Sequence, residues 1–226
     1  MRFSLPDSYF EFFLKHQILE IEDLLSINEA DQLCLKAEAL ILKRLSQKPL
    51  DLASNLELWK AGKNLWKDDP VIKKILFRLQ FGEMSHFLFK KRPIRLAYAQ
   101  TLFTENTEDC LFSQNETLPD ICCIGPLLGG ALLCLRPIEN QETETHLLPN
   151  LALTKKGRVF FFSDKYPIPF PELFKQKGLR TIILYFSPGK VRYKLEPKDP
   201  LTHALKKEGY AFGDLLKEET CPYLYR

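Results

Sequence analysis

The hydrophobic pattern of the chain centres on residues 120–137, the most apolar stretch, with no charged residue between Asp120 and Arg136. A short apolar run that ends at Arg136 and Pro137 is typical of a strand buried on both faces. Gly129 and Gly130 lie within the run, and paired glycines permit a tight bend, so the run is compatible with one strand or with two. We expect it to lie at the centre of a sheet.

Helical patterns dominate the chain before this run. Ser26 and Glu29 have the S-x-x-E spacing of a capping box, and the apolar residues behind them recur at helical spacing. This pattern predicts a helix over 27–45. The remaining elements expected in the first part of the chain are a helix over 6–15, a strand over 17–22 and a helix over 84–89.

Another helix is expected to begin at Asp69-Pro70, because Asp is a good helix cap and Pro fits the first helical position. We expect this helix to end near Gly82. Trp59 and Trp66 lie seven residues apart and are expected to anchor the core under the sheet.

From residue 94 onward the pattern favours strands separated by clusters of Pro, Gly, Asn and Asp. Helices first and strands later predict one α+β domain over 1–226, with helices packed on a β-sandwich or barrel. The expected parts are a helical portion over about 1–92, a β core over about 93–195 and a tail over 196–226. The expected strands are 94–103, 121–135, 147–153, 159–162, 181–186 and 191–195, and 203–216 is expected to form a helix or a pair of turns.

Composition places the chain among ordinary globular proteins: 45% of its 226 residues are hydrophobic and the net charge is +3. Six cysteines without a CxxC pair, in a chain without a signal-peptide pattern, favour free thiols in a reducing cytoplasm. The longest apolar run is shorter than the roughly 20 residues of a spanning helix, so membrane insertion is not expected. Nucleotide-binding P-loops and the GxSxG and HExxH motifs are absent from the sequence.

Six segments carry a resemblance to a known family: ILEIEDLLS, DPVIKKILFRLQ, RLAYAQTLF, GGALLCL, GRVFFF and RTIILYF, in this order. This order of elements resembles the Fe(II)/2-oxoglutarate-dependent oxygenases of the phytanoyl-CoA hydroxylase type. The resemblance covers residues 5–186. It implies a double-stranded β-helix, or jelly roll, with helices packed on one side.

The family's chemistry depends on a His-x-Asp/Glu pair and a distant histidine, which together hold Fe(II). The four histidines of this chain are His16, His86, His146 and His203, and none is followed two residues later by Asp or Glu. The resemblance places the first ligand pair between Phe103 and Ile121, and that stretch contains acids but no histidine. The acids are Glu105, Glu108, Asp109, Glu116 and Asp120. The distal ligand is expected within 166–168, which also lacks histidine.

One family position has a matching residue. A basic residue on the strand after the distal ligand binds the far carboxylate of 2-oxoglutarate in the family, and Arg180 falls near that spacing. The resemblance therefore implies Arg180 as a cofactor-binding residue, with bidentate binding of a carboxylate. The alternative is that Arg180 begins a strand and pairs with a surface acid.

Three functions remain open from the sequence. The first is a degenerate oxygenase-like protein without the iron site, acting as a non-catalytic binding or regulatory protein. The second is an active oxygenase with a rearranged metal site at His146, Glu142 and Glu144, and only this alternative calls for Fe(II) and 2-oxoglutarate. The third is a metal-responsive DNA-binding regulator that uses a basic strip, defined as Lys190, Arg192 and Lys194, on one face of a strand.

Overall fold

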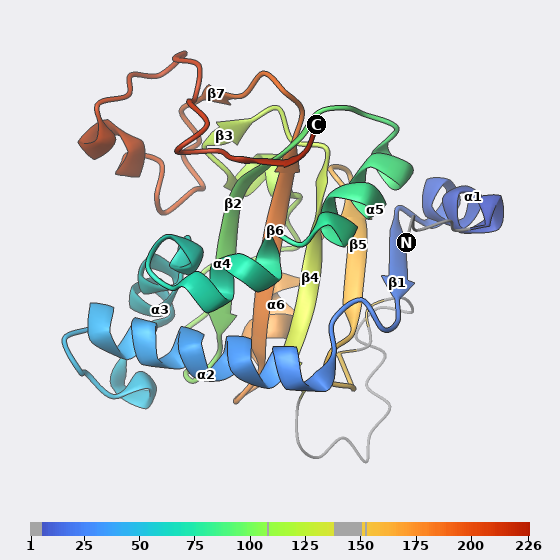
Figure 1. Ribbon diagram of the computed structural model, residues 1–226. Coiled ribbons are helices and arrows are strands. Elements are labelled where there is room, and N and C mark those ends of the chain that lie inside the picture. The colour runs from blue at the N-terminus through green and yellow to red at the C-terminus, as the bar shows by residue number, and fades with distance from the viewer. Residues whose placement is uncertain (1–5, 108, 138–150, 152) are drawn as a thin grey trace.

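The computed structural model describes residues 6–107, 109–137, 151 and 153–226, and these form an antiparallel sheet with helices packed on it (Figure 1). This confirms the α+β class. The helices are α1 (Asp7–His16), α2 (Ile27–Arg44), α3 (Asn55–Ala61), α4 (Pro70–Leu76), α5 (Leu79–Phe89) and α6 (Phe170–Phe174). The strands are β1 (Ile18–Ile21), β2 (Ile94–Phe103), β3 (Ile124–Gly125), β4 (Gly129–Arg136), β5 (Val159–Ser163), β6 (Arg180–Ser187), β7 (Arg192–Tyr193) and β8 (Tyr223–Tyr225).

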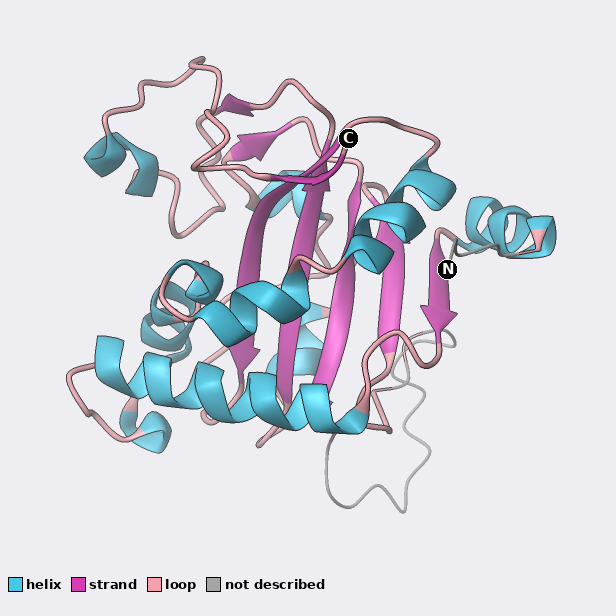
Figure 2. Cartoon of the chain, in the orientation of Figure 1, coloured by secondary structure: helices cyan, strands magenta, loops and turns pink. Residues whose placement is uncertain are grey.

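The main sheet has the strand order β1-β5-β4-β6-β2-β8, and its neighbouring strands are antiparallel (Figure 2). β4 lies between β5 and β6, so the apolar run does occupy the middle of the sheet. The run forms two strands, because β3 leaves the main sheet and pairs with β7 instead. Gly129 begins β4 with a φ of +144°, and a Cβ there would lie 2.1 Å from the carbonyl oxygen of Phe162.

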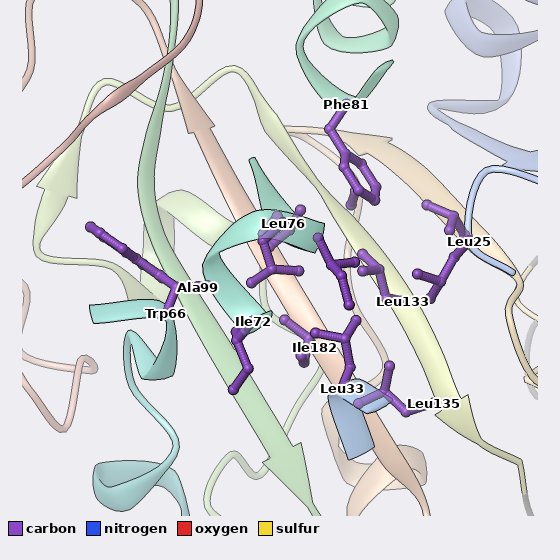
Figure 3. Close-up of a cluster of buried hydrophobic side chains, with 14 of the residues drawn as sticks. Leu25, Leu33, Trp66, Ile72, Leu76, Phe81, Ala99, Leu133, Leu135 and Ile182 are labelled. Carbon is purple, nitrogen blue, oxygen red and sulfur yellow. The ribbon is translucent and has the colours of Figure 1, made fainter. Parts of the chain in front are cut away.

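Helices α2, α4 and α5 cover one face of the sheet (Figure 1). Leu33, Ile72 and Phe81 from these helices pack in one cluster with Leu133 of β4 and Ile182 of β6 (Figure 3). Side chains of a strand alternate between its two faces, so the even-numbered residues of β6 point to the helices. We call this side of the sheet the helix face.

The odd-numbered residues of β6 point to the opposite side, which we call the inner face. A second apolar cluster covers it, and includes Ile183 and Tyr185 of β6 together with Trp59, Phe112 and Phe170. Both faces of the sheet are therefore buried, and this explains why β4 reads as a continuous apolar run and not as an alternating one.

The predicted capping box of α2 is present. The Glu29 amide donates to Ser26 Oγ at 3.3 Å, and the Ser26 amide donates to Glu29 Oε2 at 3.0 Å. Asp69 caps α4 as predicted, with Oδ1 accepting from the amides of Val71 and Ile72.

The predicted end of this helix near Gly82 is wrong. α4 ends at Leu76, and α5 begins at Leu79 and runs through Gly82. Gly82 allows α5 and β8 to pack closely, because a Cβ at this position would lie 2.7 Å from the carbonyl oxygen of Leu224 in β8.

The C-terminal tail docks on the body through β8, which pairs with Ile94 and Arg95 of β2. Arg95 is buried, and its guanidinium donates to the carbonyl oxygens of Cys221, Leu216 and Lys217. The strand predicted over 191–195 is shorter in the structure, and 203–216 contains a short 3-10 helix, Ala204–Glu208. The strand predicted over 147–153 lies mostly outside the described residues.

Among the described helices, none combines the length and the apolar character needed to cross a membrane.

Candidate functional site

The two stretches in which the resemblance expects metal ligands lie next to each other. Glu116 and Ile168 pair as an isolated antiparallel bridge, with the Ile168 amide donating to the Glu116 carbonyl at 2.9 Å. The segment before β3 therefore meets the segment before α6 at one point. We call this point the bridge junction.

A carboxylate at the bridge junction is bound by an ammonium group of the protein. The Glu116 side chain is buried, and Lys198 Nζ donates to both of its carboxylate oxygens at 2.9 Å. Gln114 Nε2 donates to Glu116 Oε1 at 3.1 Å. The hydrogen bond to Glu116 raises the pKa of Lys198, so its ammonium stays charged at neutral pH.

The residues of the bridge junction do not fit an Fe(II) site. Iron in this family needs two imidazoles and a carboxylate, whereas Glu116 is surrounded by an ammonium and an amide. In the described part of the chain, no three His, Cys, Asp or Glu side chains are grouped to hold a metal ion.

Each of the described histidines is in contact with an aromatic ring. His16 stacks on Phe12, His86 stacks on Tyr225, and His203 lies near Phe212. The alternative site at His146, Glu142 and Glu144 falls outside the described residues, as does Glu108.

Arg180 lies at the start of β6, opposite Phe103 of β2 in the register. Its guanidinium carbon is 4.4 Å from the centroid of the Phe103 ring, which belongs to the helix-face cluster. Nη2 of Arg180 forms an ion pair with Glu105, and both side chains are largely buried. A carboxylate of 2-oxoglutarate would therefore compete with Glu105 for this guanidinium. Its role in cofactor binding stays a prediction.

A second group of polar residues lies on the inner face, and we call it the inner polar cluster: Lys63, Tyr98, Gln100 and Tyr185. Lys63 Nζ and Gln100 Oε1 are buried and have no hydrogen-bond partner among the described residues. The buried hydroxyls of Tyr98 and Tyr185 have no described partner outside their own pair, in which a hydrogen bond from Tyr98 to Tyr185 shifts the pKa of both. Buried polar atoms in native proteins nearly always have a partner, so this cluster is unusual.

Contacts between these four residues place them together. Tyr98 and Tyr185 are paired across β2 and β6, and their rings stack with centroids 4.2 Å apart. Lys63 Nζ lies 4.8 Å from the centroid of the Tyr98 ring. The backbones of Lys63 and Gln100 form an isolated antiparallel bridge. Gln100 is two residues from Tyr98 and therefore lies on the same face of β2.

The orientation of the Gln100 amide is fixed by its own donors. Nε2 donates to the carbonyl oxygens of Trp59 at 2.8 Å and Thr101 at 2.9 Å. Oε1 is therefore the free acceptor. Trp59 borders the cluster, and its indole Nε1 is also buried without a described partner.

Burial raises the pKa of Tyr98 and Tyr185 well above their ordinary value, and nearby negative groups, including Asp199, raise it further. Both phenols therefore stay protonated and able to donate. The neighbouring thiol of Cys122 also has a raised pKa because of burial, so it is a poor nucleophile at neutral pH. Lys63 opposes that shift with its positive charge.

The basic strip is only partly free in the structure. Arg192 is exposed and donates to the carbonyl oxygen of Gly213 at 2.6 Å. Lys194 Nζ donates to the carbonyl oxygen of Pro119 and to Glu196, while Tyr193 on the opposite side is buried. A contact of this strip with nucleic acid stays a prediction.

Sequence reasoning did not find the inner polar cluster or Lys198. Lys63 follows a weak helical pattern, and Tyr98 and Gln100 stand in a strand whose ten residues are all buried. The available signal is the polar Gln100 in a predicted strand, IRLAYAQTLF, in which Arg95 and Thr101 are also polar.

No protein-family model matches the chain, and no curated protein matches it in sequence. Among solved structures it is similar to the non-heme α-ketoglutarate-dependent epimerase SnoN from nogalamycin biosynthesis, at 11% identity and a TM-score of 0.68. The match covers 97% of this chain and 98% of SnoN. The carbocyclase SnoK from the same biosynthesis matches with a TM-score of 0.65 at 11% identity, covering 97% of this chain and 96% of SnoK.

The comparison also finds CT296 from Chlamydia trachomatis, at 23% identity and a TM-score of 0.46, covering 83% of this chain and 97% of CT296. The likeness to SnoN and SnoK shows that the chain shares the fold of non-heme α-ketoglutarate-dependent enzymes. The resemblance in fold that the order of elements predicts is thereby confirmed.

Proposed function

We propose that the chain is a binding protein with the fold of the Fe(II)/2-oxoglutarate oxygenases, without their iron site and without their catalysis. The observation that carries this proposal is the ion pair of Lys198 and Glu116 at the bridge junction. A protonated lysine supplies the positive charge that a buried carboxylate needs, so Glu116 is stabilised without a metal ion.

We further propose that the strands form a double-stranded β-helix in a single domain over 1–226. The order β5-β4-β6-β2 in the main sheet and the separate pair β3–β7 support two layers of strands. In the proposed arrangement the inner polar cluster lies between these layers. A cytoplasmic location is also proposed, supported by six cysteines that are all free.

The test is a calorimetric titration of pure, anaerobically handled protein with Fe(II) or Mn(II), followed by 2-oxoglutarate. The expected result is no stoichiometric metal binding and no formation of succinate from 2-oxoglutarate. One equivalent of bound metal together with succinate formation would contradict the proposal. In that case the His146→Ala variant would show whether the rearranged site holds the metal.

A further inference from the structure

The inner polar cluster contains a cation whose hydrogen bonds are not used by the described protein. Lys63 Nζ is buried and unpaired, whereas the neighbouring charged groups are engaged: Asp199 accepts from the amides of Cys123 and Leu201, and Lys194 pairs with Glu196. A buried ammonium without an anion or a hydrogen-bond acceptor is strongly destabilising. Lys63 Nζ can therefore donate to an acceptor, and best to an anion.

The hydroxyls of the cluster leave one further donor. Tyr98 and Tyr185 stay protonated, and Tyr98 donates to Tyr185, so the O–H of Tyr185 is the one that can donate to a ligand. One phenol donor and one ammonium suit a carboxylate, which accepts through both of its oxygens. Hydrogen bonds of this kind to a charged acceptor are stronger than those between neutral groups.

Gln100 adds a second requirement. Its Oε1 is a buried acceptor whose orientation is fixed, so a ligand must present an N–H or O–H donor to satisfy it. An ammonium donor would bring a second positive charge close to Lys63, which is unfavourable. A hydroxyl donor carries no such penalty.

We propose that the inner polar cluster binds a small hydroxycarboxylate without a metal ion. Lys63 and the Tyr185 hydroxyl hold the carboxylate, Tyr98 orients Tyr185 through their hydrogen bond, and Gln100 Oε1 accepts from the hydroxyl of the ligand. This inference rests on the proposed function, because it assigns the ligand class of the binding protein. It uses residues of β2, β6 and the segment after α3, and it does not use the bridge junction.

The chain provides a direct reporter for this site. It has two tryptophans, Trp59 beside Gln100 and Trp66, whose indole Nε1 donates to Asn64 Oδ1 at 3.1 Å in the helix-face cluster. A nitrogen–proton correlation spectrum of the full chain therefore contains two indole signals. Titration with glycolate, in buffer with a chelator, is expected to move the Trp59 signal and to leave the Trp66 signal in place.

Matched probes and variants make the test specific. Acetate lacks the hydroxyl and glycine carries an ammonium, so both are expected to bind at least about tenfold more weakly than glycolate, which is the effect of one lost hydrogen bond to a buried group. Lys63→Met is expected to abolish the shift. Lys67→Met is the control, because Lys67 lies in the same segment but pairs with Glu208.

Tyr185→Phe removes the hydroxyl that donates to the ligand and keeps the ring, so we expect weaker glycolate binding in this variant. Glycolate that moves neither indole signal, or binds Lys63→Met unchanged, would overturn the inference; in either case the metal titration still decides the proposed function separately. Equal binding of acetate and glycolate would refute the assigned contact with Gln100.

Discussion

Arg180 and Glu105 form a largely buried ion pair, with 4% and 13% of their side-chain surfaces exposed. Removing one partner of such a pair leaves the other charge buried without compensation. The Phe103 ring beneath the guanidinium adds a cation–π contact. On these contacts Arg180 has a structural function that does not depend on 2-oxoglutarate.

We therefore expect Arg180→Met to lower the free energy of unfolding by about 3 kcal/mol, since Glu105 loses its cation. Urea denaturation measures this loss. The double variant Arg180→Met/Glu105→Leu is the control and should recover most of the stability, because both charges are gone. Unchanged stability of the single variant would show that the ion pair does not support the fold.

The pair of Lys198 and Glu116 predicts a pH dependence. Its hydrogen bond to Glu116 raises the pKa of Lys198 above the ordinary value of 10.5 in the folded protein. The stabilisation is therefore fully present below pH 10.5 and is lost as the pH rises through the folded-state pKa.

Lys198→Met is accordingly expected to be less stable than the unmodified protein at neutral pH, with the difference shrinking above pH 10.5. Urea denaturation at a series of pH values measures it, and Lys190→Met is the control at an exposed lysine of the same region. A difference that stayed constant up to the highest pH would mean that Lys198 acts through packing and not through its charge.

At the scale of elements, α5 depends on the close approach of β8. Gly82 faces the Leu224 carbonyl oxygen and the Tyr225 Cβ, which a Cβ on residue 82 would meet at 2.7 and 2.9 Å. Alanine favours a helix over glycine by about 1 kcal/mol, so helix propensity alone predicts that Gly82→Ala stabilises the protein.

We expect the opposite result, a net loss of about 1–3 kcal/mol, because overpacking moves β8 away from α5. Urea denaturation measures it. Glu83→Ala, at the next position of α5, is the control for helix propensity. A stabilised Gly82→Ala variant would mean that the tail separates from α5 without cost.

The same contact explains where sequence reasoning succeeded and where it failed. Local signals are sufficient for α2, whose capping residues Ser26 and Glu29 are three positions apart, and for β4, whose apolar run is continuous. The sequence mispredicts the end of α4, because a glycine such as Gly82 is typical of a helix end. The glycine is instead required by β8, which is more than 140 residues later in the chain.

The candidate sites show the same limit. The absence of a His-x-Asp/Glu pair is a property of the sequence and could be read directly. Tyr98 meets Tyr185 because β2 and β6 are neighbours in the sheet, and Glu116 meets Lys198 through segments outside the strands. No spacing within the chain predicts these pairings. For Arg180 the sequence allows a cofactor carboxylate or a surface acid as partner, and the acid that the structure places there, Glu105, is largely buried.

At the scale of the whole molecule, the two faces of the sheet differ in polarity. The helix face is packed with aliphatic and aromatic side chains from α2, α4 and α5 (Figure 3). The inner face is also buried, but β6 places the hydroxyls of Thr181 and Ser187 there beside that of Tyr185, and those of Thr181 and Ser187 lack a described partner. Buried hydroxyls are thus gathered on the side where a bound molecule can accept hydrogen bonds from them.

We propose that this fold binds its ligand without a metal ion. The most direct measurement is the dissociation constant of glycolate, determined by calorimetry on the full chain first with a chelator and then with added Mn(II). The same dissociation constant is expected in both conditions, and Lys63→Met is expected to lose binding. Binding that appears only when Mn(II) is present would contradict metal-free binding, because the ligand would then depend on a metal site of the oxygenase type.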